Sequence, residues 1–155
     1  MIRATRILLA ATLALAPAAV AVAGSHEGNP AQKARNAHMG LYGAHLGVLG
    51  AMAKGNMEYD AELAAALAGN VAALAGMNQA LYWEEGTEAG MLEGSRALPE
   101  IWSNREDFDG LSVKLQEAAL ALQDAAPNGL EAFQPAFGAV GQACGACHKV
   151  YRQPE

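Results

Sequence analysis

Apolar residues recur at alternating steps of three and four along four stretches of this 155-residue chain. Such spacing is typical of amphipathic helices, because residues three and four apart lie on the same helical face. β-Branched residues are scarce and alanine is abundant, so no stretch after the N-terminal segment has the pattern of a strand. The sequence therefore predicts an all-α protein with four helices.

The first two predicted helices are joined by a short turn. The first runs from about Asn29 or Pro30 to Lys54, where Gly55 supplies a stop signal. Its apolar stripe comprises Met39, Tyr42, Leu46, Leu49 and Ala53. The second opens at Asp60, a good N-cap residue. Its stripe comprises Leu63, Leu67, Val71 and Leu74.

A loop of about 20 residues, rich in glycine from Gly86 to Gly94, precedes the third helix. This helix starts near Asn104 or Arg105, and its stripe comprises Phe108, Leu111, Leu115, Ala118 and Leu122. A break at residues 126–129 precedes the fourth, whose stripe comprises Leu130, Phe133, Phe137, Val140, Cys144, Cys147 and Tyr151. Four amphipathic segments with mostly short connections predict an antiparallel up-down-up-down four-helix bundle.

The first 23 residues have the features of a cleaved secretory signal peptide. Arg3 and Arg6 form a basic start, residues 7–22 are an apolar run, and Ala21-Val22-Ala23 is a small-residue cleavage site. The run is interrupted by Pro17 and is short for a membrane span, which needs about 20 residues. An uncleaved anchor is therefore the less favoured alternative. We expect export to the bacterial periplasm and one mature domain, residues 24–155.

The mature domain is expected to be acidic. The whole chain has 10 basic and 16 acidic residues, a net charge of −6. Because the predicted leader holds two basic residues and no acidic one, the remainder has 8 basic and 16 acidic residues, a charge of −8. Such a balance argues against nucleic acid as a ligand and favours partners with a basic docking face.

The segment Cys144-Gly145-Ala146-Cys147-His148 matches C-x-x-C-H, the signature of covalent haem attachment. In such a site the two thiols bond to the haem and the histidine supplies an axial nitrogen to the iron. A thioredoxin-like pair belongs to a βαβ pattern, and a structural zinc site needs about four ligands, so both alternatives are weaker. Both cysteines lie on the stripe of the fourth helix, which places the expected haem inside the bundle.

The chain resembles the class II cytochromes c, which include the high-spin cytochromes c′ and their low-spin relatives. The likeness extends over about residues 30–152 and rests on the haem motif with Lys149-Val150-Tyr151-Arg152 after it, on Pro99-Glu100-Ile101-Trp102 and on Gly86-Thr87-Glu88. The segment 48–55 followed by Tyr59-Asp60 is more similar to the low-spin branch. The resemblance implies a four-helix bundle with one haem c near one end.

The same resemblance implies roles for single residues. His148 would be the proximal axial ligand, and Cys144 and Cys147 the thioether anchors. Met39, four residues after Arg35, would face the other side of the haem. In the low-spin branch a methionine at this place is the sixth ligand, whereas in cytochromes c′ the matching residue only crowds the iron.

Bundle geometry independently supports a position of Met39 near the haem, because the start of the first helix and the end of the last lie at the same end of the bundle. A methionine that only fills the core is the alternative. Met77 and Met91 are weaker candidates, since no predicted stripe directs them to the haem. Met52 and Met57 belong to the opposite end. His38 is expected at a boundary or in solvent, because it projects about 100° away from Met39.

Two arginines are candidates for contacts with the haem edge. Arg35 lies one helical turn before Met39, and the family resemblance implies a cation there; a surface charge is its alternative. Arg152 lies four residues after His148, where it could pair with a haem propionate.

The expected function is that of a periplasmic monohaem one-electron carrier whose iron is held by His148 and Met39. No acid–base pair or nucleophile in the pattern indicates an enzyme. The alternative is a cytochrome c′-type protein in which Met39 shields an iron position that binds nitric oxide or carbon monoxide. Redox proteins are the expected partners, and the expected oligomeric state is a monomer or a homodimer.

Overall fold

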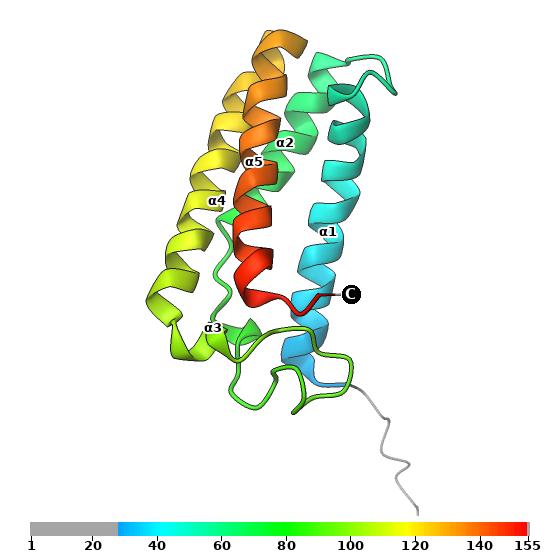
Figure 1. Cartoon of the computed structure of the whole chain (residues 1–155). Helices are drawn as coiled ribbons and strands as arrows, with labels where there is room; N and C mark the ends of the chain where they lie inside the picture. The colour runs from blue at the N-terminus through cyan, green and yellow to red at the C-terminus, as the bar shows by residue number, and fades with distance from the viewer. Residues whose placement is uncertain (1–27, 155) are drawn as a thin grey trace, which may run out of the picture.

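The computed structural model describes residues 28–154 and contains four long helices in an antiparallel bundle (Figure 1). These are α1 (Pro30–Ala53), α2 (Ala61–Ala75), α4 (Arg105–Ala125) and α5 (Leu130–Tyr151). Consecutive long helices pack side by side, and α1 closes the ring against α5. The predicted up-down-up-down bundle is confirmed. The predicted signal peptide lies outside the described residues.

The helices begin where the sequence places capping residues. The side chain of Asn29 accepts a hydrogen bond from the backbone N–H of Gln32 at 3.1 Å, and that of Asp60 accepts one from Leu63 at 3.0 Å. Each bond satisfies an N–H group that the first helical turn leaves without a partner. Gly129, with φ of +93°, occupies a conformation that favours glycine and turns the chain into α5.

The long connection between α2 and α4 carries local structure of its own. It contains the 3-10 turn η1 (Ala80–Tyr82) and the short helix α3 (Glu100–Ser103), which the sequence pattern does not predict. A second 3-10 turn, η2 (Ala126–Asn128), joins α4 to α5. Near α3 the backbone N–H of Leu98 donates to the carbonyl of Tyr151 at 3.0 Å. The connection therefore lies across the end of the bundle where α1 begins and α5 ends (Figure 1).

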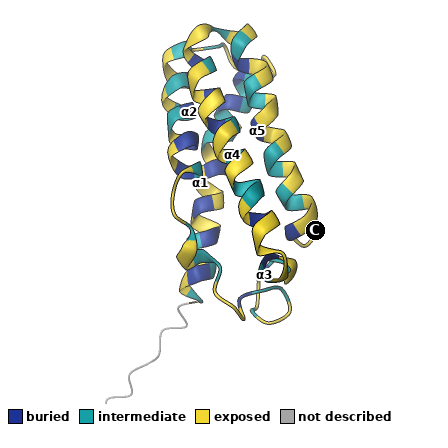
Figure 2. Cartoon of the chain, turned by 90° about the vertical axis from the view of Figure 1, so that its left-hand side faces the viewer, coloured by how far each residue is buried: buried dark blue, intermediate teal, exposed yellow. Residues whose placement is uncertain are grey.

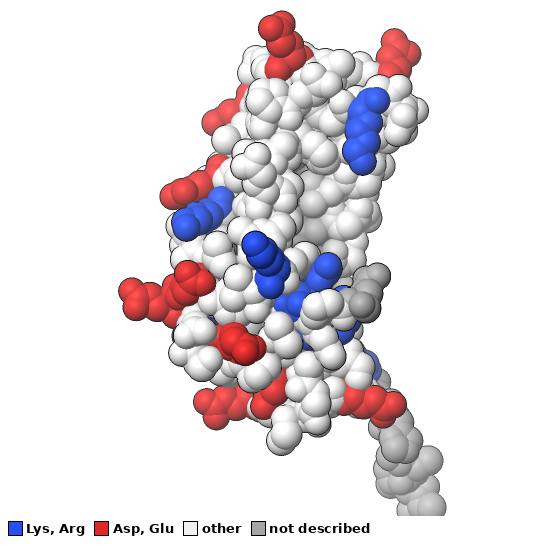
Figure 3. All heavy atoms as spheres, in the orientation of Figure 1, with Lys and Arg blue, Asp and Glu red and all other residues white. Residues whose placement is uncertain are grey.

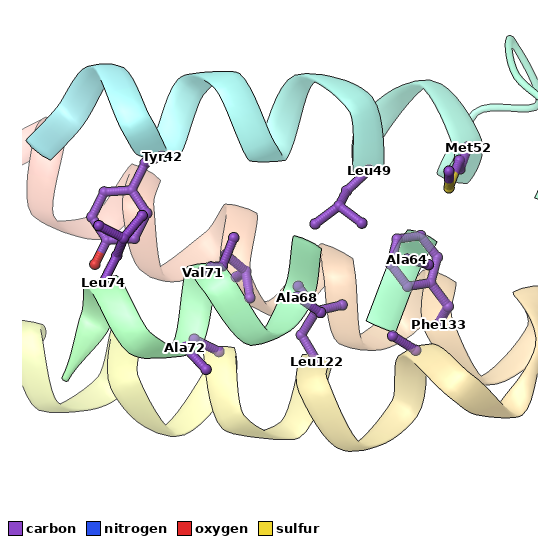
Figure 4. Packing of buried hydrophobic residues seen from close by; sticks show 13 residues of the cluster. Tyr42, Leu49, Met52, Ala64, Ala68, Val71, Ala72, Leu74, Leu122 and Phe133 are labelled. Atoms are coloured by element: carbon purple, nitrogen blue, oxygen red, sulfur yellow. The ribbon is translucent and has the colours of Figure 1, made fainter. Parts of the chain in front are cut away.

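The main hydrophobic core fills the space between the four long helices. Leu49 and Met52 of α1, Val71 of α2, Leu122 of α4 and Phe133 of α5 are fully buried, and they point toward one another (Figure 4). A second, smaller cluster lies near α3 and the end of α5: Ile101, Phe108 and Tyr151, with Trp83, Trp102, Leu111 and Cys147 packed against it. Exposed residues lie along the outer faces of the helices (Figure 2).

Besides Met39, which is 41% exposed and lines the cavity described below, two residues of the predicted stripes do not belong to the core. Leu63 is 40% exposed and Leu130 is 37% exposed, so their predicted burial is wrong. In α2 the buried face instead starts one position later, with Ala64 and Ala68 at 0% exposure. Small side chains allow α2 to pack closely against its neighbours, and this close packing turns the larger Leu63 outward.

No helix in the described range 28–154 is both long and apolar enough to cross a membrane.

Candidate functional site: a cavity around the C-x-x-C-H motif

A cavity of about 590 Å³ lies at the end of the bundle where α1 begins and α5 ends. Cofactor and ligand sites typically measure about 300–1,000 Å³. Side chains of α1, α4 and α5 line the cavity, together with residues 94–97 of the long connection. Its apolar lining includes Leu46, Ile101, Phe108, Leu111 and Leu115. The cavity therefore suits a large, mostly apolar cofactor.

The reactive residues of the haem motif line this cavity from the last turns of α5. Cys144, Cys147 and His148 are each half-buried, and spacings of three and four bring them toward one face of the helix. Burial raises the pKa of Cys144, and it raises the pKa of Cys147 to about 11, so both are neutral thiols near pH 7. Burial lowers the pKa of His148, with smaller contributions from Arg152 and Arg96. A neutral imidazole is the form that binds iron.

Met39 lines the same cavity from α1, with 41% of its surface exposed. It is the one methionine among the described residues that does so. Met52 is buried in the core, whereas Met77 and Met91 are 49% and 72% exposed and lie outside the cavity. The structure therefore brings Met39 and His148 together and does not bring the competing methionines to them.

Arg35 is buried at 5% exposure, so the alternative of a surface charge is wrong. Its Nη1 donates to the carbonyl of Tyr82 at 3.0 Å and to Oγ1 of Thr87 at 2.7 Å. Its Nη2 donates to the carbonyl of Thr87 at 2.9 Å and to Oγ of Ser95 at 3.4 Å. The guanidinium carbon also lies 5.2 Å from the centre of the Trp83 ring. These bonds hold the long connection against α1.

All four acceptors of Arg35 are neutral. Burial in these surroundings lowers the pKa of Arg35. A buried cation with no carboxylate among its described hydrogen-bond partners is costly unless an anion compensates it. The bonds use both terminal nitrogens and leave Nε–H as a donor. Since Arg35 also lines the cavity, a haem propionate would be a fitting counter-ion.

Two further arginines line the cavity near the chain end. Arg152 directly follows α5 and is exposed, as expected for a side chain that reaches a haem edge. Arg96, which the sequence analysis missed, donates from Nε and Nη2 to the carbonyl of Gln153 at 3.2 and 2.7 Å. The backbones of Ala97 and Arg152 form an antiparallel bridge. This pairing with a distant segment brings Arg96 to the site, and no local sequence signal marks it.

The predicted exposure of His38 is wrong. His38 is 3% exposed, because η1 folds back and covers its face of α1. Its ring packs edge-on against Tyr42 at 4.9 Å and Tyr82 at 5.5 Å, and burial lowers its pKa. Nε2 of His38 and Oη of Tyr42 are buried without a hydrogen-bond partner among the described residues. His38 does not line the cavity, whereas Tyr42 does.

The cavity is basic although the chain is acidic. Three arginines and no acidic residue stand among the described residues that line it. Figure 3 shows basic side chains gathered around the C-terminal end of α5, with acidic ones on the left-hand side and at both ends of the bundle. An apolar interior, two thiols, a neutral imidazole and a basic rim match the parts of haem c: its ring, its vinyl groups, its iron and its carboxylates.

Comparison with known proteins gives the same assignment. A family model described as Cytochrome C′ matches residues 30–152. Cytochrome c-554 of Cereibacter sphaeroides is 40% identical over 121 residues, which cover 78% of this chain and 79% of the relative. A solved structure, "Cytochrome c′ from Rhodobacter Spheriodes", has a TM-score of 0.79 and 33% identity, and the match covers 81% of this chain and 96% of that one.

A second solved structure is the nitric oxide complex of a variant of cytochrome c prime from Alcaligenes xylosoxidans. Its TM-score is 0.71 at 32% identity, with 81% of this chain and 94% of that chain covered. The matched range contains all four long helices and the complete haem motif. The chain therefore belongs to the cytochrome c′ family of class II cytochromes c, and its cofactor is covalently attached haem c.

Proposed function

We propose that this protein is a periplasmic one-electron carrier whose single haem c is anchored by Cys144 and Cys147, with His148 and Met39 as the axial ligands of the iron. The bound haem supplies an iron centre that alternates between the ferric and ferrous states. The chain would attach the haem, ligate its iron and shield it partly from water. No residue is assigned a catalytic role.

The placement of Met39 and His148 in the lining of one cavity carries this proposal. They come from α1 and α5, which lie side by side and antiparallel in the bundle (Figure 1). Cys144 and Cys147 anchor the ring on the α5 side. A thioether from α1 would then meet the other face of the iron and stabilise its ferrous state, which raises the reduction potential.

The surroundings support electron transfer through an exposed edge. Arg35, Arg96 and Arg152 line the cavity and would neutralise the haem propionates, while the apolar lining residues would exclude water. The net charge of −8 expected for residues 24–155, with 8 basic and 16 acidic residues, would steer a partner with a basic docking face at long range. Export through the predicted signal peptide would bring the chain to the compartment where we expect haem attachment and electron transfer.

The iron–sulfur bond is tested with Met39→Leu in the holoprotein. Leucine keeps the apolar bulk but has no sulfur. We expect the ferric wild-type protein to be low-spin and to show the weak red absorption band of an iron–methionine bond, and the variant to lose this band. Met77→Leu is the matched control, because Met77 is exposed outside the cavity. A wild-type protein that is already high-spin, or a Met39→Leu variant that keeps the band, would refute the ligation.

The second candidate function is gas binding. It is favoured by the similarity to a cytochrome c prime solved as its nitric oxide complex, and by the 41% exposure of Met39. In that case Met39 shields the iron instead of ligating it. Carbon monoxide should then bind the ferrous wild-type protein rapidly and in a single phase. If Met39 ligates, binding should be limited by release of the sulfur and should become faster in Met39→Leu.

A further inference from the structure

An exposed carboxylate of α4 contacts a residue that lines the cavity, and neither the sequence analysis nor the proposed function uses it. Asp107 belongs to the first turn of α4. Its Oδ2 accepts a hydrogen bond of 2.7 Å from Oη of Tyr151, a residue that is 3% exposed and lines the cavity. Tyr151 therefore holds the negatively charged side chain of Asp107 next to the part of α5 that carries the haem motif.

The Tyr151 side of this contact is held by packing and by a second polar contact. The rings of Tyr151 and Phe108 pack edge-on with centres 5.2 Å apart, and Oη of Tyr151 also lies 3.5 Å from the carbonyl of Asn104. Cys147 packs against the same cluster. Through Tyr151, the carboxylate of Asp107 therefore adjoins the cluster that contains the thioether anchor Cys147.

A negative charge near a haem changes the relative stability of its ferric and ferrous forms, and thus its reduction potential. The ferric form carries one more positive charge than the ferrous form, so a nearby carboxylate stabilises the ferric form. The charged side chains that line the cavity itself are Arg35, Arg96 and Arg152, and these favour the ferrous form. Asp107 opposes them from the α4 side.

We propose that Asp107, positioned by its hydrogen bond from Tyr151, lowers the reduction potential of the haem by holding a negative charge on the proximal side. This inference rests on attachment through Cys147 and His148, as in the proposed function, but not on ligation by Met39. The charge acts on the iron in the low-spin and in the high-spin state alike.

The test measures the reduction potential of the holoprotein by spectroelectrochemical titration. Asp107→Asn removes the charge but keeps an oxygen that can accept the bond from Tyr151. We expect the equilibrium constant for reduction to rise about threefold, which is about 28 mV at 59 mV per tenfold for one electron. Asp107→Glu should restore most of the wild-type potential, because it restores the charge.

Asp109→Asn is the matched control. Asp109 lies on the same helix but pairs with Arg105 at 2.9 Å on an exposed face, so its loss should leave the potential nearly unchanged. Tyr151→Phe should raise the potential by less than Asp107→Asn, since the freed carboxylate moves into water. In the double variant, Tyr151→Phe should add nothing to Asp107→Asn.

Equal potentials for Asp107→Asn and Asp109→Asn would overturn the proposal, as would additive effects in the double variant. These outcomes are distinct from a failure of the proposed function. A high-spin spectrum would refute ligation by Met39, yet the potential of Asp107→Asn would still rise. If Asp107 had only a structural role, Asp107→Asn would lower the free energy of unfolding but leave the reduction potential unchanged.

Discussion

Replacing Arg35 with methionine should destabilise the site more than any other single change at the cavity rim. Methionine keeps the length and apolar stem of the side chain but removes the guanidinium. In the wild type this group makes four hydrogen bonds to Tyr82, Thr87 and Ser95, which lie 47 to 60 residues away in the chain. The substitution therefore releases the long connection from α1.

The loss of stability depends on which hydrogen bonds the former partners of Arg35 still make after the substitution. Four bonds from a charged donor, at about 1.5–3 kcal/mol each, would sum to about 6–12 kcal/mol. However, Oγ1 of Thr87 still donates to the carbonyl of Glu84, and Oγ of Ser95 still donates to the carbonyl of Thr87. Removing a buried charge also recovers its desolvation cost. We therefore expect a loss of about 3 kcal/mol in the free energy of unfolding, or about 12 °C in Tm.

The assay is urea unfolding of the ferric holoprotein, followed by circular dichroism, together with hydrogen exchange of residues 82–97. Arg35→Met should lower the midpoint and increase exchange in this segment, while Arg35→Lys should lie between it and the wild type, because lysine keeps the charge but not the planar fork. Arg105→Met is the control: its exposed pair with Asp109 should contribute less than about 1 kcal/mol. If Arg35→Met and Arg105→Met have equal midpoints, the guanidinium does not hold the connection.

Two further predictions concern tyrosines. Tyr42→Phe removes a buried hydroxyl that has no described hydrogen-bond partner, so it should leave the free energy of unfolding unchanged or raise it by up to about 1 kcal/mol. Tyr59→Phe loses a hydrogen bond to the carbonyl of Ala126 and should lower the free energy of unfolding by about 1 kcal/mol. A change of the same sign in both variants would contradict this reasoning. The bond to Asp107, and then burial, raise the pKa of Tyr151 to about 12, above its ordinary value of about 10, so its contribution to stability is present below pH 10 and is lost between pH 10 and 12. Unfolding of Tyr151→Phe measured across this window should therefore depend less steeply on pH than that of the wild type.

The sequence predicts those parts of the molecule that are encoded locally. Helical spacing and the caps Asn29 and Asp60 locate the long helices, because capping involves only neighbouring residues. The haem motif is equally local, since its five residues lie within two turns of α5. The cavity that contains both Met39 and His148 then follows from antiparallel topology, which places the start of α1 beside the end of α5.

Residues whose surroundings come from distant segments were not predictable in this way. His38 looks exposed on an isolated helix, and only the fold of η1 onto α1 buries it. Leu63 fits a regular stripe, yet close packing of α2 through Ala64 turns it outward. Arg96 carries no motif and reaches the cavity because its strand-like segment pairs with the end of the chain. In each case a tertiary contact outweighs the local pattern.

The long connection, more than the bundle, determines the polar surroundings of the haem site. Its residues bind Arg35 on one side and the backbone beyond His148 on the other, so it joins α1 and α5 across the cavity. The main core lies elsewhere, between the four long helices, and does not include this segment. A substitution in the connection can therefore change the charge, the access of water and the position of Arg35 at the rim while the bundle stays folded. We therefore expect this connection and the residue at position 39 to decide whether the haem of this protein carries electrons or binds a gas.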